Sequence, residues 1–187
     1  LTLSRLEGSP LPGMTEWTPV QALMQRCEDE ARGLSALLTQ SQARPHVLEF
    51  PPAEQLRALG EIAGVPTELQ SALSNLISNA IKHTGAGVVY VGVRRRTLYR
   101  EGGQLCIEVR DSGCGIPLAQ QAYLFDAYRS FDDRKASDSH GLGLAIAKAQ
   151  ATYLGADITL RSAPGRGSVF TLCGVSTRNQ NVPVDFP

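Results

Sequence analysis

The sequence has no excess of charge of either sign, because 18 basic residues balance 18 acidic ones in a chain of 187 residues. A neutral chain has no general attraction to nucleic acid or to an anionic membrane, so a polyanion must be recognised by local groups. The sequence also lacks an apolar run of the roughly 18 residues that a membrane helix needs, and it lacks a signal-peptide pattern. We therefore expect no nucleic-acid partner and a cytoplasmic location for this chain, which leaves a membrane-bound parent protein open.

Cysteine is scarce, and the four cysteines do not cluster: they are Cys27, Cys106, Cys114 and Cys173. No CxxC pair occurs, so neither a zinc site nor a disulfide framework is expected. We predict reduced thiols that act as small core-filling residues, as free cysteine commonly does.

Two common phosphate-binding motifs are also missing. No GxxxxGK[ST] sequence occurs, which excludes a P-loop. No GxGxxG follows a predicted strand, which removes the usual dinucleotide fingerprint. Any nucleotide site in this chain must therefore be built from other residues.

What is present indicates one globular domain. The apolar fraction of 42% is ordinary for a folded protein and excludes wholesale disorder. A chain of this length buries a real core, and we expect one domain with a tail at each end. Glycine and proline between Gly8 and Gly13 mark the first boundary. We place the domain at residues 14–175 and a flexible C-terminal tail at residues 176–187.

Apolar spacing and turn residues predict the elements of this domain. The predicted helices cover residues 20–38, a segment that begins at Pro66, and residues 141–154, where Gly155 is a good stop. The predicted strands cover residues 46–50, 88–93 and 105–111, followed by a hairpin of residues 156–162 and 167–173. We expect the basic link of residues 94–103 to be a solvated hairpin loop. Residues 118–140 show little period, so they are expected to be disordered or to form a functional lid.

The second predicted helix carries Asn75 and Asn79, which lie one turn apart on the same side. Its apolar residues share one face and are Leu69, Leu73, Leu76, Ile77, Ala80 and Ile81. A carboxamide beside such a face loses contact with water and must recover hydrogen bonds or a metal. Mg²⁺ prefers oxygen ligands and is commonly shared with nucleotide phosphates, so an asparagine oxygen suits it.

Glycine clusters in the second half of the chain are the other predicted parts of a nucleotide site. Asp111 closes a predicted strand, and Gly113 and Gly115 in the next turn let backbone approach a flat ligand. A carboxylate there accepts a hydrogen bond from an exocyclic amine such as that of adenine. Gly141 and Gly143 stand where a helix begins, and free N–H groups at a helix start favour phosphate oxygens.

In order and spacing these segments resemble the catalytic ATP-binding domain of sensor histidine kinases, within the wider gyrase, Hsp90, histidine kinase and MutL superfamily. "NLISNAIKHT" resembles the N box, "DSGCGIP" the first Gly box and "LFDAYRSFD" the F box. "GLGLAIAKA" is similar to the second Gly box and "GRGSVFTL" to the last. The resemblance covers about Trp17 to Gly174. It implies that residues 1–13 are the end of a preceding dimerisation helix and its linker.

The resemblance implies an α/β fold: a two-layer sandwich of the Bergerat type, in which a mixed, mostly antiparallel sheet packs on three helices. It implies ATP and Mg²⁺ as ligands, with Asn79 on the metal, Lys82 and His83 by the phosphates and ribose, and Asp111 on the adenine amine. The remaining residues that it implies for nucleotide binding are Asn75, Gly113, Gly115, Ile116, Phe125, His140, Gly141, Leu142, Gly143 and Leu144. Phe125 would anchor the lid, which we expect to be disordered without nucleotide.

The resemblance also implies a branch of the superfamily. Hydrolysing relatives carry a glutamate four residues before the metal asparagine, whereas this chain has Asn75, which cannot act as a general base. Catalysis would then be phosphoryl transfer that rests on Asn75, Lys82 and an arginine at the γ-phosphate, for which Arg129 is our choice and Arg134 the alternative.

The phosphoacceptor expected for such a kinase is missing. None of His46, His83 and His140 has the expected setting, and His46 is expected to be a surface residue at a strand end. The implied partners are a histidine-bearing dimerisation domain of the same protein and a downstream response regulator. The parent protein would be a homodimer, and an inner-membrane sensor is one type of parent that the resemblance implies. Two other functions stay open: a nucleotide-free interaction module and a hydrolysing ATPase.

Overall fold

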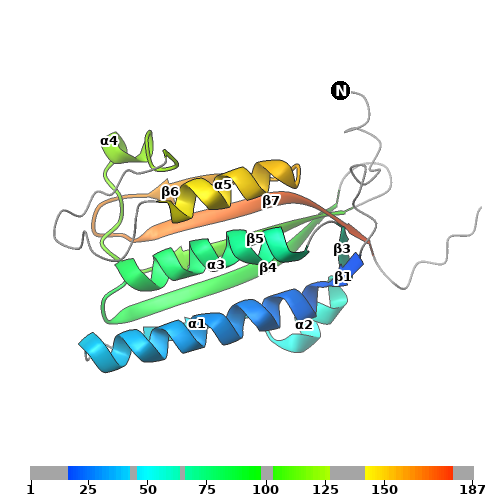
Figure 1. Ribbon diagram of the computed structural model, residues 1–187, viewed down its shortest axis with the longest axis horizontal. Helices are drawn as coiled ribbons and strands as arrows, with labels where there is room; N and C mark the ends of the chain where they lie inside the picture. The colour runs from blue at the N-terminus through cyan, green and yellow to red at the C-terminus, as the bar shows by residue number, and fades with distance from the viewer. Residues whose placement is uncertain (1–16, 43–45, 64–65, 98–102, 127–141, 179–187) are drawn as a thin grey trace, which may run out of the picture.

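The computed structural model describes residues 17–42, 46–63, 66–97, 103–126 and 142–178. The long helices lie over one face of a single seven-stranded sheet (Figure 1). In chain order the elements are β1 Trp17–Pro19, α1 Val20–Gln42, β2 His46–Glu49, α2 Ala53–Ala58, β3 Glu61–Ala63, α3 Pro66–His83, β4 Gly87–Thr97, β5 Gly103–Asp111, α4 Leu118–Gln121, α5 Gly143–Tyr153, β6 Asp157–Ser162 and β7 Ser168–Arg178. The predicted α/β two-layer fold is confirmed.

The sheet is mixed and mostly antiparallel. Its strand order is β1-β3-β7-β5-β4-β2, with β6 also paired to β7. Only the β2–β4 pair is parallel among these pairings. Because β5 pairs with β7 along its whole length, β6 and β3 share the opposite side of β7, with β6 at its start and β3 at its end.

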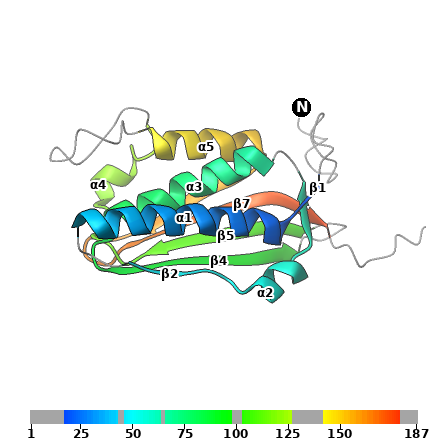
Figure 2. The same ribbon diagram turned by 60° about the horizontal axis from the view of Figure 1, so that its bottom comes forward.

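The core lies between the sheet and the long helices α1, α3 and α5. Helix α3 is central, with α1 on one side and α5 on the other (Figure 2). Its buried residues include the whole apolar face predicted from the sequence: Leu69, Leu73, Leu76, Ile77, Ala80 and Ile81. Alternate strand residues meet this face, and those buried include Val89, Val91, Leu105, Ile107, Val109, Phe170 and Leu172. The sequence pattern therefore predicted the buried face of α3 correctly.

The sheet edge beside β1 joins the two ends of the described chain. The Arg178 guanidinium, at the end of β7, lies 4.2 Å from the centre of the Trp17 ring in β1. The same guanidinium forms an ion pair of 2.7 Å with Glu61 of β3. These contacts hold three strands together at the end of the sheet opposite to Asp111 and Ser168, which are paired in the β5–β7 ladder.

Several local predictions were wrong. The basic segment Arg94–Arg96 belongs to strand β4 and not to a loop, although Arg94 and Arg96 are exposed as expected. Strands β1 and β3 and the short helices α2 and α4 were not predicted. Strand β7 continues to Arg178, three residues beyond the predicted end of the domain at residue 175. Residues 118–126 were expected to lack structure, but they contain helix α4 and a following turn.

The prediction of four reduced thiols was also wrong, because Cys106 and Cys173 form a disulfide with a Cα–Cα distance of 4.2 Å. The two cysteines face each other directly across strands β5 and β7. The register of β5 against β7 shifts between Leu105 and Cys106, so the disulfide lies beside an irregularity in the pairing of these strands. Cys27 is a buried free thiol, as predicted, while Cys114 is free but exposed.

Within the described ranges, no helix combines the length and the apolar character needed to cross a membrane.

Candidate nucleotide-binding site

The site is built around Asp111, the last residue of β5. This side chain is buried, with 6% of its surface exposed. Its Oδ1 accepts a hydrogen bond of 2.8 Å from the backbone N–H of Gly113. In the sheet Asp111 stands opposite Val89 on one side and Ser168 on the other. The carboxylate is therefore fixed at the point where the strand ends and the glycine turn begins.

Burial raises the pKa of the Asp111 carboxyl above its ordinary value, because removal from water disfavours the charged form. Hydrogen bonding from Gly113 and from the backbone and hydroxyl of Ser168, together with the charge of His83, opposes this rise. A carboxylate kept partly out of water accepts a hydrogen bond more strongly than an exposed one. The site thus holds an acceptor ready for a donor on a ligand.

This pKa shift predicts a pH effect on stability. A carboxyl whose pKa is higher in the folded chain favours folding while it is protonated, and this contribution is lost as the pH rises through the folded pKa. Asp111→Asn removes the titration. We therefore expect the free energy of unfolding of the natural chain to fall relative to that of Asp111→Asn as the pH rises from about 4. Urea unfolding of both chains over a pH series measures this, and a constant difference would contradict it.

The turn after Asp111 is bound to the turn between β6 and β7. The N–H of Ile116 donates to the hydroxyl of Ser162 at 2.8 Å, and the N–H of Gly165 donates to the carbonyl of Cys114 at 2.7 Å. The Gln121 amide, in α4, donates to the carbonyls of Ile116 and Ser162. The first and last Gly boxes thus form one connected unit.

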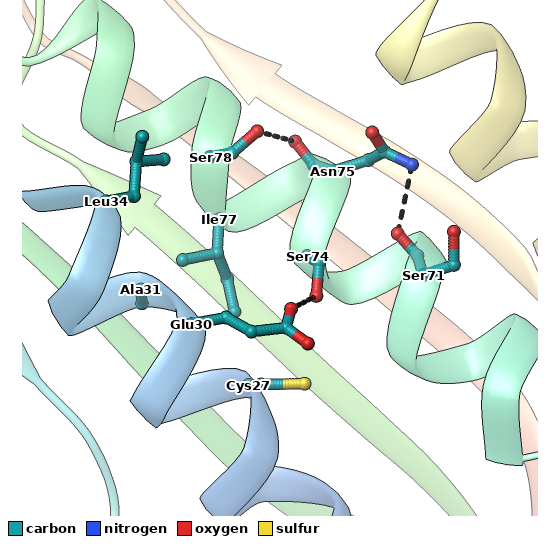
Figure 3. A pocket seen from close by; sticks show the side chains of 9 residues that line it. All are labelled: Cys27, Glu30, Ala31, Leu34, Ser71, Ser74, Asn75, Ile77 and Ser78. Carbon is teal, nitrogen blue, oxygen red and sulfur yellow. Dashed lines mark hydrogen bonds between the residues drawn. The ribbon is translucent and has the colours of Figure 1, made fainter.

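Helix α3 brings the asparagines to this region. The Asn75 amide is half-buried, and its Nδ2 donates a 3.0 Å hydrogen bond to the carbonyl of Ser71 (Figure 3). The side chain points away from α1, and its oxygen lies next to α5, where a Cβ added at Gly143 would meet Asn75 Oδ1 at 3.2 Å. Asn79 is half-buried one turn later on the same side. Lys82 and His83 are exposed at the end of the helix.

Helix α5 begins at Gly143, beside Asn75. The N–H of Ile146 donates a hydrogen bond of 2.9 Å to the carbonyl of the N-cap residue Leu142. The earlier N–H groups of the first turn, on Gly143, Leu144 and Ala145, have no partner one turn back in the helix. Free N–H groups at a helix start favour an anion, and among the described residues the N-cap residue Leu142 does not occupy them with its side chain.

Four predicted residues lie outside the described residues: Arg129, Arg134, His140 and Gly141. Phe125 is described, and it is a half-buried residue packed against the core. Its ring lies 5.3 Å from the ammonium of Lys148 in α5.

His46 was expected at the surface, but it is half-buried and contacts the end of α3. Its Nε2 lies 2.8 Å from the carbonyl oxygen of Thr84, the residue that follows His83. Ser168 was also missed as a site residue, although it faces Asp111. Only the pairing of β5 with β7 places Ser168 opposite Asp111, and the spacing of residues along the sequence does not reveal this pairing.

A cavity of about 270 Å³ lies between α1 and α3, behind the asparagine helix (Figure 3). It is lined by Cys27, Glu30, Ala31, Leu34, Ser71, Ser74, Asn75, Ile77 and Ser78. Ser74 donates a hydrogen bond to Glu30 inside it. Burial raises the pKa of the Cys27 thiol to about 12, so this thiol stays protonated and unreactive at neutral pH. The Asn75 amide turns away from this cavity, which is therefore separate from the site around Asp111.

Helix α3 therefore contacts both other parts of the candidate site: the Gly113 turn after Asp111 packs on the carbonyl of His83, and Gly143 at the start of α5 lies beside Asn75. The histidine kinase-, DNA gyrase B- and HSP90-like ATPase family matches residues 64–176, and the chain belongs to this family. Its residues form a catalytic ATP-binding domain of the sensor histidine kinase kind.

The similar curated proteins are sensor kinases. The signal transduction histidine-protein kinase BarA of Escherichia coli K12 is 36% identical over 129 residues, which are 67% of this chain and 14% of BarA. The aerobic respiration control sensor protein ArcB of the same organism is 39% identical over 146 residues, which are 76% of this chain and 18% of ArcB. The chain thus spans less than a fifth of the length of these relatives.

Solved structures share the fold. The mycobacterial sensor histidine kinase MprB has a TM-score of 0.63 at 19% identity, covering 88% of this chain and all of that chain. Full-length ShkA in complex with AMPPNP has a TM-score of 0.67 at 20% identity, covering 96% of this chain and 37% of ShkA. At this level of identity the likeness concerns the fold alone.

Proposed function

We propose that the domain binds ATP with Mg²⁺ and donates the γ-phosphoryl group to a histidine on a dimerisation domain outside this chain. The observation that carries the proposal is the Asp111 carboxylate, buried at the end of β5 and fixed by Gly113. A buried acceptor at this place suits the exocyclic amine of adenine. In this proposal the other groups that contact the nucleotide lie on α3 and α5.

The adenine end of the proposed site is formed by the first Gly box. A Cβ added at Gly113 would lie 2.4 Å from the carbonyl oxygen of His83, so this turn packs directly on the end of α3. Gly115 and Ile116 follow in the same turn, and Ile116 is a half-buried apolar residue packed against the core. In this proposal they form an apolar wall beside the base, while Asp111 accepts its amine hydrogen.

The residues of the site fit a magnesium ion that takes one oxygen ligand from the protein. They do not fit an ion that is surrounded by protein ligands alone. Within the part of the chain that the structure describes, no group of three His, Cys, Asp or Glu side chains stands ready to hold an ion. Mg²⁺ typically keeps several waters and shares one or two protein oxygens with substrate phosphates. The half-buried Asn79 amide supplies such an oxygen without adding negative charge beside the phosphates. When bound there, the ion would neutralise phosphate charge.

The phosphate end is proposed at the start of α5, where Gly143 and Leu144 present backbone N–H groups. Lys82 is exposed at the end of α3 and would contribute positive charge. Asn75 is neutral, and its Nδ2 is already bonded to the backbone of α3. It therefore orients groups and cannot remove a proton from water, so hydrolysis by the domain alone is proposed to be slow.

The remaining steps of the proposal concern the parent protein. Phosphoryl transfer depends mainly on positioning and charge neutralisation, so the nucleophilic histidine can come from another domain. We propose a histidine-bearing dimerisation domain of the same protein as its source and a response regulator as the next acceptor. A homodimeric parent, in which this domain lies in the cytoplasm and extends at least to Arg178, completes the proposal.

Asp111→Asn is expected to weaken binding of a nonhydrolysable ATP analogue by about 1–3 kcal/mol, the size of a lost charge-assisted hydrogen bond. Calorimetry with Mg²⁺ present measures this change. Asn79→Ala is expected to lose affinity in Mg²⁺ and to change little in EDTA, because its role depends on the ion.

Asp29→Asn is the matched control for the carboxylate, since Asp29 is exposed on α1. Unchanged affinity in Asp111→Asn would refute the adenine assignment. Failure of the natural chain to bind any adenine nucleotide would favour an interaction module. Rapid turnover without an acceptor domain would instead favour a hydrolysing ATPase.

A further inference from the structure

Lys148 contacts residues of two other elements, although no role for it was predicted from the sequence. It projects from α5 and forms an ion pair with Asp157 at the start of β6. Its ammonium also donates to the carbonyl of Ile158 at 3.2 Å. The same ammonium lies 5.3 Å from the centre of the Phe125 ring. One side chain thus connects α5, β6 and the segment that contains Phe125.

We propose that Lys148 is a positioning residue that holds the F-box turn, residues 122–126, against α5. The inference deepens the proposed function and rests on it for its meaning in catalysis. Helix α5 begins at Gly143, so Lys148 lies five residues after Gly143 and four after Leu144, whose N–H groups are proposed to bind phosphate. The Lys148 ammonium thus holds the turn that carries Phe125 in a defined position relative to α5, the helix that would receive the phosphates.

The contacts of the ammonium have different strengths. Asp157 is 67% exposed, and an ion pair with an exposed partner contributes little to stability. The ion pair instead fixes the position of the Lys148 side chain. The hydrogen bond with Lys148 is also the main reason why the pKa of the Asp157 carboxyl is lowered. The Lys148 side chain itself is only 35% exposed, so its contact with the Phe125 ring is partly shielded from water. A cation over an aromatic ring is attracted more strongly when water is excluded.

Apolar packing alone is the competing explanation for the position of Phe125. Leu124, Phe125 and Leu144 are all partly buried against the core. The two explanations differ in what they require at position 148. Packing needs the aliphatic stem, which methionine retains, whereas the proposal needs the positive charge, which arginine retains.

The decisive experiment is amide hydrogen exchange of residues 122–126 without nucleotide. Lys148→Met is expected to reduce their protection about fivefold, in keeping with a partly shielded cation–π contact, and Lys148→Arg should stay within about twofold of the natural chain. Asp157→Asn should retain most of the protection, because the ring and the Ile158 carbonyl still hold the ammonium. Circular dichroism checks that each variant is folded.

Three outcomes would overturn the proposal. Natural protection in Lys148→Met would show that packing is sufficient. Equal loss in Lys148→Met and Lys148→Arg would show that charge is not what matters. An equal loss of protection in Asp157→Asn and Lys148→Met would show that the ion pair with Asp157, and not the contact with the Phe125 ring, holds the turn.

A second measurement separates this inference from the proposed function. Affinity for a magnesium-loaded ATP analogue is expected to fall about fivefold in Lys148→Met and to recover in Lys148→Arg, because the helix and the turn are no longer aligned. Unchanged affinity in Lys148→Met would overturn the link to the nucleotide. If the natural chain binds no nucleotide, the proposed function fails, while the exchange result still decides whether Lys148 holds the turn.

Discussion

Reduction of the Cys106–Cys173 disulfide is expected to lower the free energy of unfolding by about 4 kcal/mol, by the chain-entropy relation for a loop of this length. The bond closes a sequence separation of 67 residues, and it joins two strands in the middle of the sheet. Domains of this size are stable by only about 5–15 kcal/mol, so this is a large fraction of the total. Urea unfolding with and without a thiol reductant measures the change.

The double variant Cys106→Ala with Cys173→Ala is the control for the reductant. Its unfolding curve should not respond to reductant, whereas the single variant Cys114→Ala, which removes an exposed free thiol, should respond as the natural chain does. Coincident curves for the oxidised and reduced natural chain would contradict the prediction. Thiol titration of the unfolded chain should find two free thiols, those of Cys27 and Cys114, before reduction.

Gly115→Ala is expected to destabilise the domain by at least about 2 kcal/mol, because it combines backbone strain with a steric clash. Gly115 has a φ of +69°. A Cβ there would lie 1.9 Å from the carbonyl oxygen of Ala163, which belongs to the neighbouring turn. Since backbone atoms cannot move aside easily, the two Gly boxes would separate and nucleotide affinity would fall as well. Thermal unfolding and calorimetry measure the two effects.

Gly165→Ala is the matched control for this variant. Gly165 has a φ of +73°, but a Cβ there would meet nothing within 4 Å. Its replacement therefore costs only the strain of a left-handed backbone, about 1–2 kcal/mol. The prediction is wrong if the two variants lose the same stability, since the clash with Ala163 would then have no effect.

The sequence predicted those parts of the fold that depend on local periodicity. The apolar face of α3 repeats at helical spacing, and its residues are buried as expected. Asp111 ends a strand and Gly143 begins a helix, because charged residues and glycines interrupt regular patterns at these points. The resemblance predicted one nucleotide site that contains Asp111, Asn75 and the start of α5, and both this shared site and the individual nucleotide-binding roles stay predictions.

The parts that failed depend on contacts between distant residues. Cys106 and Cys173 are scattered in the sequence, and only the register of β5 against β7 brings them together. Ser168 reaches Asp111 through the same register. The three-residue strands β1 and β3 are too short to show a period, and they form because β1 pairs with β3 and β3 pairs with β7. His46 lies against Thr84 because β2 runs parallel to β4, which local spacing does not specify.

The contact between Trp17 and Arg178 has a practical consequence, because Trp17 is the only tryptophan of the chain. Its indole is the dominant fluorophore excited near the red edge of protein absorbance, and it sits at the rim where β1, β3 and β7 meet. Emission from the unlabelled domain therefore reports on that rim, far from Asp111, and ligand titrations need a separate probe.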